Sequence, residues 1–164
     1  YPDNGHHFLD ALYKSLSSRP RLKVGTFAEQ TARTPARPMK RLAAGSWVYG
    51  SFSTWIGSAD KNRGWDYLVA AKRAYDSVVA TGKLNADQLA LATRQLAVCE
   101  GSDWFWWFGD YNPSESVASF DRLFRQNLAH LYRLLKLPVP DALAHPISVG
   151  GGAPEAGGAM RRSS

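Results

Sequence analysis

The residues of this sequence that are best suited to chemistry are aromatic, and they gather in two short segments that contain glycines at both ends. Residues 44–57 form the first segment and residues 100–110 the second, and together they hold five of the six tryptophans of the 164-residue chain. Five consecutive aromatic side chains, at residues 104–108, cannot all face one core, because a regular backbone distributes successive side chains around its axis. Some of them must therefore face another surface, a ligand or a partner.

A tryptophan beside a carboxylate is suited to binding a sugar, since the C–H face of the sugar stacks on the indole ring while the carboxylate accepts hydrogen bonds from hydroxyl groups. Asp103 directly precedes Trp104, and Glu100 lies in the same segment. The alternative is structural: the tryptophans would fill a helix core and a domain interface, and the acids would cap helices or make buried hydrogen bonds. The candidate sugar contacts are Trp104, Asp103, Trp47, Trp55, Trp106 and Glu100.

Other reactive groups lack the partners that their chemistry needs. His6 and His7 are adjacent, so on a helix they point about 100° apart, and no third metal ligand is near. The serines near the aromatic segments have no histidine and aspartate with an identifiable nucleophile geometry. No phosphate loop or other cofactor motif is visible. We therefore expect surface histidines, no metal and no cofactor.

The excess of positive charge is local. The chain has 20 basic and 14 acidic residues, and seven basic residues and one acid fall within residues 19–41, where prolines indicate a solvated loop. Phe27 is the one aromatic residue there that could stack on a base, so we expect no nucleic-acid binding.

No apolar run is long enough to cross a membrane, so we expect no membrane partner. The single cysteine, Cys99, cannot form an internal disulfide, which favours a reducing, cytoplasmic compartment.

The front of the chain has the pattern of a helix, a strand and the start of another helix. Phe8, Leu12 and Leu16 recur every four residues behind a capping asparagine, which predicts a short amphipathic helix that Pro20 ends. Residues 22–26 alternate as in a strand, before a further helical turn. A strand needs partners for its backbone groups, and this chain offers no obvious sheet. We therefore expect the chain to be a piece of a larger protein.

The middle of the chain predicts three longer helices. The first begins after Ser58 and ends at Gly82, the second begins after Asn85, and the third begins at Ser114 and stops at a Leu-Pro pair. We expect a mainly α fold in which these helices pack as an antiparallel helical bundle. The stripe of the third helix that should face the core is Val117, Phe120, Leu123, Phe124, Leu128, Leu131 and Leu135.

Several strings of this sequence together resemble one enzyme family. They are Tyr1-Pro2-Asp3-Asn4-Gly5, Ala44-Gly45-Ser46-Trp47, Trp55-Ile56-Gly57 and Glu100-Gly101-Ser102-Asp103-Trp104-Phe105-Trp106-Trp107. They are similar to the C-terminal part of glycoside hydrolase family 57, and in particular to its α-amylase and amylopullulanase-like members, over roughly residues 1–137. The last string resembles the last of that family's five sequence signatures.

The resemblance implies a retaining enzyme that acts on α-glucans, in which a pseudo-TIM (β/α)7 barrel is followed by a helical domain. Residues 1–43 would be a helix-strand remnant of the end of that catalytic barrel with a basic linker, and residues 22–26 a late barrel strand. Residues 44–145 would be the C-terminal helical domain. For residues 146–164 the composition predicts a disordered glycine-rich tail.

The resemblance also implies that the catalytic residues precede this chain. Retaining glycosidases use two carboxylates about 5–5.5 Å apart, and in the family both lie N-terminal to the segment that is resembled here. We therefore expect the isolated chain to be inactive and to contact an α-glucan or oligosaccharide in the full enzyme. We also expect it to self-associate through the face that the missing N-terminal catalytic barrel would cover. The alternatives are a non-catalytic helical module that binds carbohydrate or a protein partner, and an anion-binding domain that uses residues 19–41.

Overall fold

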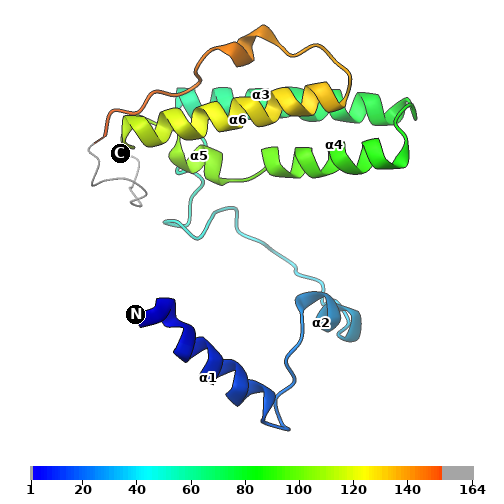
Figure 1. Ribbon diagram of the computed structural model, residues 1–164, viewed down its shortest axis with the longest axis vertical. Helices are drawn as coiled ribbons and strands as arrows, with labels where there is room; N and C mark the ends of the chain where they lie inside the picture. Colours follow the sequence, from blue (N-terminus) through cyan, green and yellow to red (C-terminus); the bar gives the residue numbers. More distant parts are fainter. Residues whose placement is uncertain (1, 153–164) are drawn as a thin grey trace. The chain divides into compact units, whose positions relative to one another are not determined.

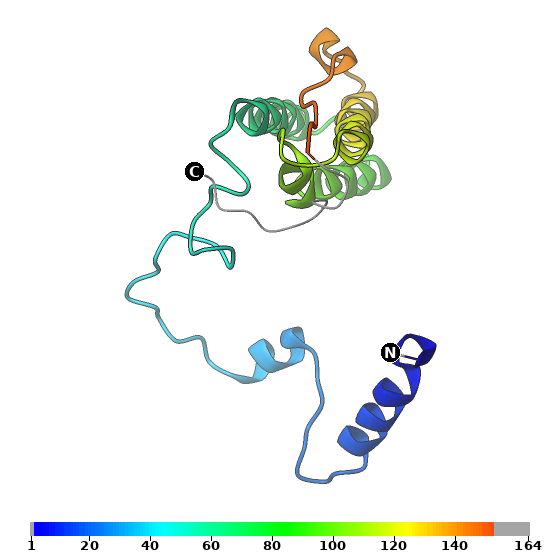
Figure 2. The same ribbon diagram turned by 90° about the vertical axis from the view of Figure 1, so that its left-hand side faces the viewer.

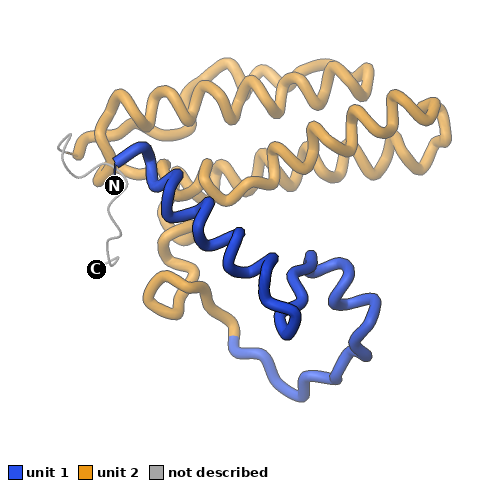
Figure 3. The backbone as a smooth tube through the Cα atoms, turned by 60° about the horizontal axis from the view of Figure 1, so that its bottom comes forward, with its two compact units in different colours: residues 1–43 blue, residues 44–164 orange. Residues whose placement is uncertain are grey.

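Helices dominate residues 2–152, which are the residues that the computed structural model describes (Figure 1). They confirm the expectation of a mainly α protein. The chain divides into two units, residues 1–43 and residues 44–164 (Figure 3). This division falls at the same position as the first domain boundary in the sequence-based prediction.

Short helical segments make up the first unit. A 3-10 segment, η1 (Pro2–Gly5), leads into α1 (His6–Ser17), and α2 (Phe27–Arg33) follows. A capping box begins α2: the Thr26 hydroxyl accepts a hydrogen bond from the backbone N–H of Glu29 at 3.2 Å, and the Glu29 carboxylate accepts one from the N–H of Thr26 at 2.8 Å. No described residue of this unit is buried.

The strand predicted over residues 22–26 is not formed. These residues are irregular, and within residues 2–152 there is no strand to which they could pair. An extended segment without a neighbouring strand has no partners for its N–H and C=O groups, so the alternation of side chains alone does not produce a ladder. The helix that follows does begin at Phe27, as predicted.

The described part of the second unit contains three long helices and two short helical elements. They are α3 (Ala59–Ala80), α4 (Ala86–Cys99), α5 (Asp103–Trp107), α6 (Ser114–Leu134) and the 3-10 segment η2 (Asp141–Ala144). Gly82 takes a left-handed φ of 63° just past the end of α3, where a side chain would be strained. Asn85 and Gln88 form a capping box at the start of α4, with hydrogen bonds of 2.9 and 3.1 Å.

The core lies where α3, α4 and α6 pack against one another and α5 packs against α6. Figure 1 shows α4 running opposite to α3 and α6, and Figure 2 shows the three helices nearly end-on. Of the stripe predicted on α6, Leu123 is the exception, since it is 43% exposed. One side of α4 is also uncovered, because Leu91 and Val98 are exposed. The buried members of the core include Leu68, Leu96, Phe105, Phe108, Phe124, Leu128 and Leu131.

After α6 the chain returns over this helix (Figure 1) and is fixed to it by Asp121. The Asp121 carboxylate is almost fully buried and accepts hydrogen bonds from the backbone N–H groups of Ile147, at 2.7 Å, and Ser148, at 3.3 Å. Both of those residues are buried as well. Ile147 and Ser148, which the sequence placed in a disordered tail, are therefore packed against the helices. Residues 153–164 of the predicted tail lie outside the described residues.

Candidate functional site: a tryptophan cluster

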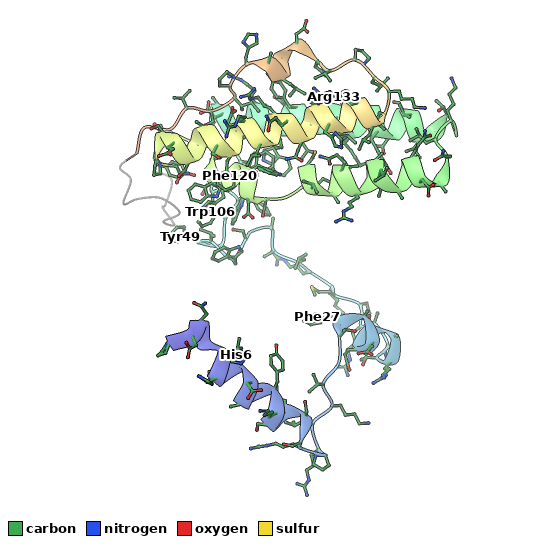
Figure 4. The ribbon with its side chains drawn as sticks, in the orientation of Figure 1. His6, Phe27, Tyr49, Trp106, Phe120 and Arg133 are labelled. Carbon is green, nitrogen blue, oxygen red and sulfur yellow. The ribbon has the colours of Figure 1, made fainter. Side chains whose placement is uncertain are left out.

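The five aromatic side chains of residues 104–108 spread over separate surroundings, as expected from the geometry of a helix. Phe105 and Phe108 are fully buried in the core. Trp107 stacks on Phe120 of α6, with ring centroids 4.8 Å apart and planes 13° apart. Trp106 faces another way, and in the view of Figure 4 it lies between Phe120 and Tyr49, which belongs to the first aromatic segment.

Trp47, Trp55 and Trp106 meet in one group, which we call the tryptophan cluster. The ring centroids of Trp47 and Trp106 are 6.0 Å apart and their planes are 9° apart. Trp55 lies at a tilt to both, with its centroid 6.3 Å from that of Trp47 and 5.9 Å from that of Trp106. Trp47 keeps 75% of its surface exposed, whereas the other two rings are half-buried. The structure thus brings together three of the six predicted sugar contacts.

The loop that carries Trp47 and Trp55 is closed on itself. The hydroxyl of Ser46 accepts a hydrogen bond from the N–H of Val48 at 3.2 Å and also donates to the carbonyl of Ser51. A side chain at Gly45 would place its Cβ 2.4 Å from the carbonyl oxygen of Gly50, so the loop can close this tightly only with glycine at that position. Val48, whose N–H makes the first of these hydrogen bonds, is almost fully buried.

Trp104 does not join the tryptophan cluster. Its indole Nε1 donates a hydrogen bond to the carbonyl of Val98 at 3.0 Å, and its ring lies against Phe120 and Phe124, with centroids 6.2 and 5.8 Å away. These contacts fix the turn between α4 and α5 to the core. The sugar-binding role predicted for Trp104 stays a prediction, and the contacts that the structure shows are packing contacts.

The two candidate acids lie in the turn between α4 and α5. Glu100 is the C-cap residue that follows α4, and Asp103 is the first residue of α5, where its negative charge is favourable at a helix N-terminus. Both are exposed. Within residues 2–152, no hydrogen bond or ring contact joins either carboxylate to the tryptophan cluster. The geometry of the cluster by itself is therefore that of a stacking surface, without an attached acid or nucleophile.

A buried lysine supports the tryptophan cluster, and it was missed in the sequence. Lys61, in the first turn of α3, is 1% exposed. Its ammonium donates hydrogen bonds to the carbonyl of Thr54 and to the hydroxyl of Tyr111, the latter at 2.6 Å. Burial lowers the pKa of Lys61 to about 8, and it raises the pKa of Tyr111, to which the charge of Asp110 adds.

A signal for this burial was present in the spacing. Lys61 precedes Gly64, Leu68 and Ala71 by three, seven and ten residues, and all three face the core. A lysine in register with such a face either extends its apolar stem so that the ammonium reaches water, or buries the ammonium among hydrogen-bond acceptors. The sequence pattern shows that Lys61 lies on the buried face of the helix. Whether its ammonium is buried or reaches water depends on acceptors from distant segments, which the pattern does not show.

Asn112 fixes the chain after α5. Its amide nitrogen donates hydrogen bonds to the carbonyls of Trp106 and Trp107, at 3.1 and 2.9 Å, so it satisfies carbonyl groups at the end of the helix. Trp65 has a similar role at the other segment, because its Nε1 donates to the carbonyl of Trp55 at 2.9 Å. Each of the two aromatic segments is thus held by a side chain that binds the backbone of a cluster tryptophan.

Residues 2–152 contain neither a helix with the length and apolar character needed to cross a membrane nor a group of three or more His, Cys, Asp or Glu residues that could hold a metal ion. Comparison of the whole chain with protein-family models, with curated proteins and with solved structures found no match.

Proposed function

We propose that this chain is the C-terminal helical domain of a retaining, α-glucan-active glycoside hydrolase similar to family 57, and that its tryptophan cluster contacts the glucan. One observation carries the proposal. Trp47, Trp55 and Trp106 come from the separate aromatic strings on which the resemblance rests, and they meet in a single group. A common role at one surface is a simple reason for these three strings to converge.

The geometry of the cluster suits a pyranose. The C–H face of a sugar is flat and apolar, and a largely exposed indole such as that of Trp47 can cover it. One aromatic stacking contact is worth about 0.5–1.5 kcal/mol beyond the burial of apolar area. Contacts of this size support dissociation constants of about 1 mM, which correspond to about 4 kcal/mol. We therefore propose weak, saturable binding of maltooligosaccharides by this chain.

In this proposal, residues 1–43 are a remnant of a catalytic barrel, and the barrel itself precedes the resembled segment. The exposed apolar side chains of α1, among them Phe8 (68% exposed) and Tyr13 (61% exposed), fit a helix that packs on further structure. The paired carboxylates of a retaining glycosidase would belong to that barrel. The chain would then contribute aromatic substrate contacts and packing, and alone it would not hydrolyse starch and would tend to self-associate.

A non-catalytic helical module that binds carbohydrate is the second candidate, and the exposure of Trp47 favours it. The two candidates share the binding surface and differ in the rest of the protein. A barrel with the other family signatures, encoded immediately upstream of Tyr1, is expected under the first candidate. A start codon directly before Tyr1 would favour the second.

Affinity electrophoresis in a native gel with embedded amylopectin tests the binding surface that both candidates require. The chain is basic, with a pI near 9.6, so the gel is run at acidic pH. We expect amylopectin to retard the chain and Trp47→Ala to abolish the retardation, while Lys72→Met, on the exposed part of α3, leaves it unchanged. Equal mobility with and without amylopectin would contradict the proposal.

A further inference from the structure

The proposed function leaves the buried ammonium group of Lys61 unexplained. Its side chain is 1% exposed, and within residues 2–152 no carboxylate lies within ion-pair distance of it. A buried cation that is held by neutral acceptors alone is expensive to desolvate. An apolar side chain of similar length would fill the same space without that cost, so packing alone does not account for a lysine here.

The acceptors of this ammonium belong to the two segments that form the tryptophan cluster. Thr54, whose carbonyl accepts one hydrogen bond, directly precedes Trp55. Tyr111, whose hydroxyl accepts the other, donates its own hydrogen to the carbonyl of Trp106 at 3.4 Å. The Lys61 nitrogen also lies 5.0 Å from the centroid of the Tyr111 ring. One cation on α3 therefore connects the backbone beside Trp55 with the backbone of Trp106.

The position of Tyr111 is itself tightly fixed. Gly109 has a φ of 125°, which favours glycine, and a Cβ at that residue would lie 2.6 Å from the Tyr111 ring. A Cβ at Gly152 would lie 2.0 Å from the Tyr111 carbonyl oxygen. The Tyr111 hydroxyl is thus presented to Lys61 from a segment that is closely packed against Gly109 and Gly152.

We propose that Lys61 is a positioning residue, which holds Trp55 and Trp106 in the relative orientation that forms the tryptophan cluster. The effect of Lys61 on glucan binding rests on the proposed function. Its effect on the orientation of the rings does not, because that orientation can be measured in the chain without a ligand. An ammonium group has three donors, so Lys61 can bind both segments at once. Methionine would fill its place without bonding either segment.

The other charged groups near Lys61 have roles of their own. Asp60, next to it on α3, accepts a hydrogen bond from the Ser148 hydroxyl at 2.9 Å. Asp110, next to Tyr111, is exposed. The pKa of Lys61, lowered to about 8 by burial, agrees with the absence of a compensating carboxylate among the described residues.

Fluorine NMR of the chain labelled with 5-fluorotryptophan tests this inference without a ligand. Its six tryptophans give separate resonances that single Trp→Phe variants assign. In Lys61→Met and in Tyr111→Phe, we expect the resonances of the tryptophan cluster to shift or broaden while those of Trp104 and Trp107 stay in place. Lys72→Met removes a partly exposed lysine of the same helix that contacts no residue of the tryptophan cluster, so it is the matched control and should move none of them.

Tyr111→Phe loses one oxygen atom and keeps its ring, so it decides the question if Lys61→Met does not fold. Unmoved cluster resonances in a folded variant, or equal shifts of all six tryptophans, would overturn the inference. The second readout is affinity for maltoheptaose, which should fall about tenfold in both variants, equivalent to about 1.4 kcal/mol. If the wild type binds maltoheptaose but the resonances of the variants do not move, the positioning role alone is overturned. If the resonances of the variants shift but the wild type does not bind, the proposed function alone is overturned.

Discussion

The ring planes of Trp47 and Trp106 are 9° apart, although the first lies in an irregular loop and the second in the short helix α5. Such a loop does not determine the direction of a side chain by its own periodicity. Its attachments do: the carbonyl of Trp55 accepts a hydrogen bond from Trp65, and the carbonyl of Thr54 accepts one from Lys61. Both donors lie on α3, so this helix positions the loop that carries Trp47 and Trp55.

Truncation of two tryptophans should separate packing from binding. Trp104→Ala removes a hydrogen-bonded ring that packs against Phe124, so we expect it to lower the free energy of unfolding by about 3 kcal/mol. Trp47→Ala removes a ring that is 75% exposed, so its effect should stay within about 0.5 kcal/mol. Urea denaturation followed by circular dichroism measures both. Equal losses of stability would show that Trp47 is as structural as Trp104.

Gly64→Ala should destabilise the second unit, although alanine is the better helix former. In an exposed helix the change would stabilise by about 1 kcal/mol. Here the added Cβ would lie 2.9 Å from a ring carbon of Phe108 and 3.1 Å from one of Phe105, and overpacking of this kind costs about 1–3 kcal/mol. We expect a net loss in thermal unfolding. Gly101→Ala, whose Cβ would meet its neighbours at an ordinary 3.4 Å, is the control. A higher midpoint for Gly64→Ala than for the wild type would refute the tight approach of α3 to these rings.

Lys61 should give stability a defined dependence on pH. Burial lowers its pKa to about 8 in the folded chain, while the unfolded chain has the ordinary value of 10.5. Between these values the unfolded state binds more protons at this site, so the free energy of unfolding rises with pH, by about 1.4 kcal/mol for each full pH unit. Cys99 acts in the opposite direction above pH 9, because burial raises its pKa from 9.0 to about 11 and the folded thiol keeps a proton that the unfolded thiol loses.

The interval from pH 8 to 9 therefore reports mainly on Lys61, because the opposing contribution of Cys99 is still small there. We expect urea denaturation to show a rise of about 1 kcal/mol across it for the wild type. The Lys61→Met variant should lose this rise and show a flat or slightly falling profile, because only the small contribution of Cys99 is left. The same rise in both proteins would mean that another group is responsible.

Asp121→Ala should loosen the segment after α6. The Asp121 carboxylate accepts hydrogen bonds from the N–H groups of Ile147 and Ser148 and pairs with Arg125 at 2.8 Å. Removal of one partner from a buried ion pair costs about 3–5 kcal/mol, since the other charge is left uncompensated. Limited proteolysis should cut the variant within residues 140–152 faster than the wild type. Unchanged protection there would show that buried side chains alone hold this segment.

Much of the fold could be predicted because its signals are local. Caps and periodicity located the first residues of α3, α4 and α6 correctly and the end of α3 within about two residues, whereas the Leu-Pro pair expected to stop α6 begins three residues beyond the observed end at Leu134. The prediction of a strand over residues 22–26 was wrong. Alternation of side chains is a local signal, whereas a β-ladder also needs a second strand, which no residue in the segment supplies. The burial of Ile147 was missed because glycines nearby suggested a tail, and its anchor, Asp121, lies on a different element.

The same distinction applies to the candidate site. The residue types of Trp47, Trp55 and Trp106 indicated a stacking surface, but their convergence depends on long-range contacts that composition does not contain. Trp104 shares their type and neighbourhood, yet a hydrogen bond to Val98 directs it to the core. Lys61 was overlooked because a lysine is ordinarily a surface residue, and its acceptors lie on other segments.

Isothermal titration of maltoheptaose into the wild type and Trp47→Ala tests the central claim most directly. We predict saturable binding to the wild type with a dissociation constant of about 1 mM, and binding to Trp47→Ala that is about tenfold weaker or undetectable, which corresponds to the loss of at least 1.4 kcal/mol of stacking and burial. Cellohexaose, whose β-linkages present the sugar faces differently, should bind more weakly than maltoheptaose. An absence of heat with the wild type at saturating maltoheptaose, or the same affinity in both proteins, would contradict the role of the tryptophan cluster in binding α-glucans.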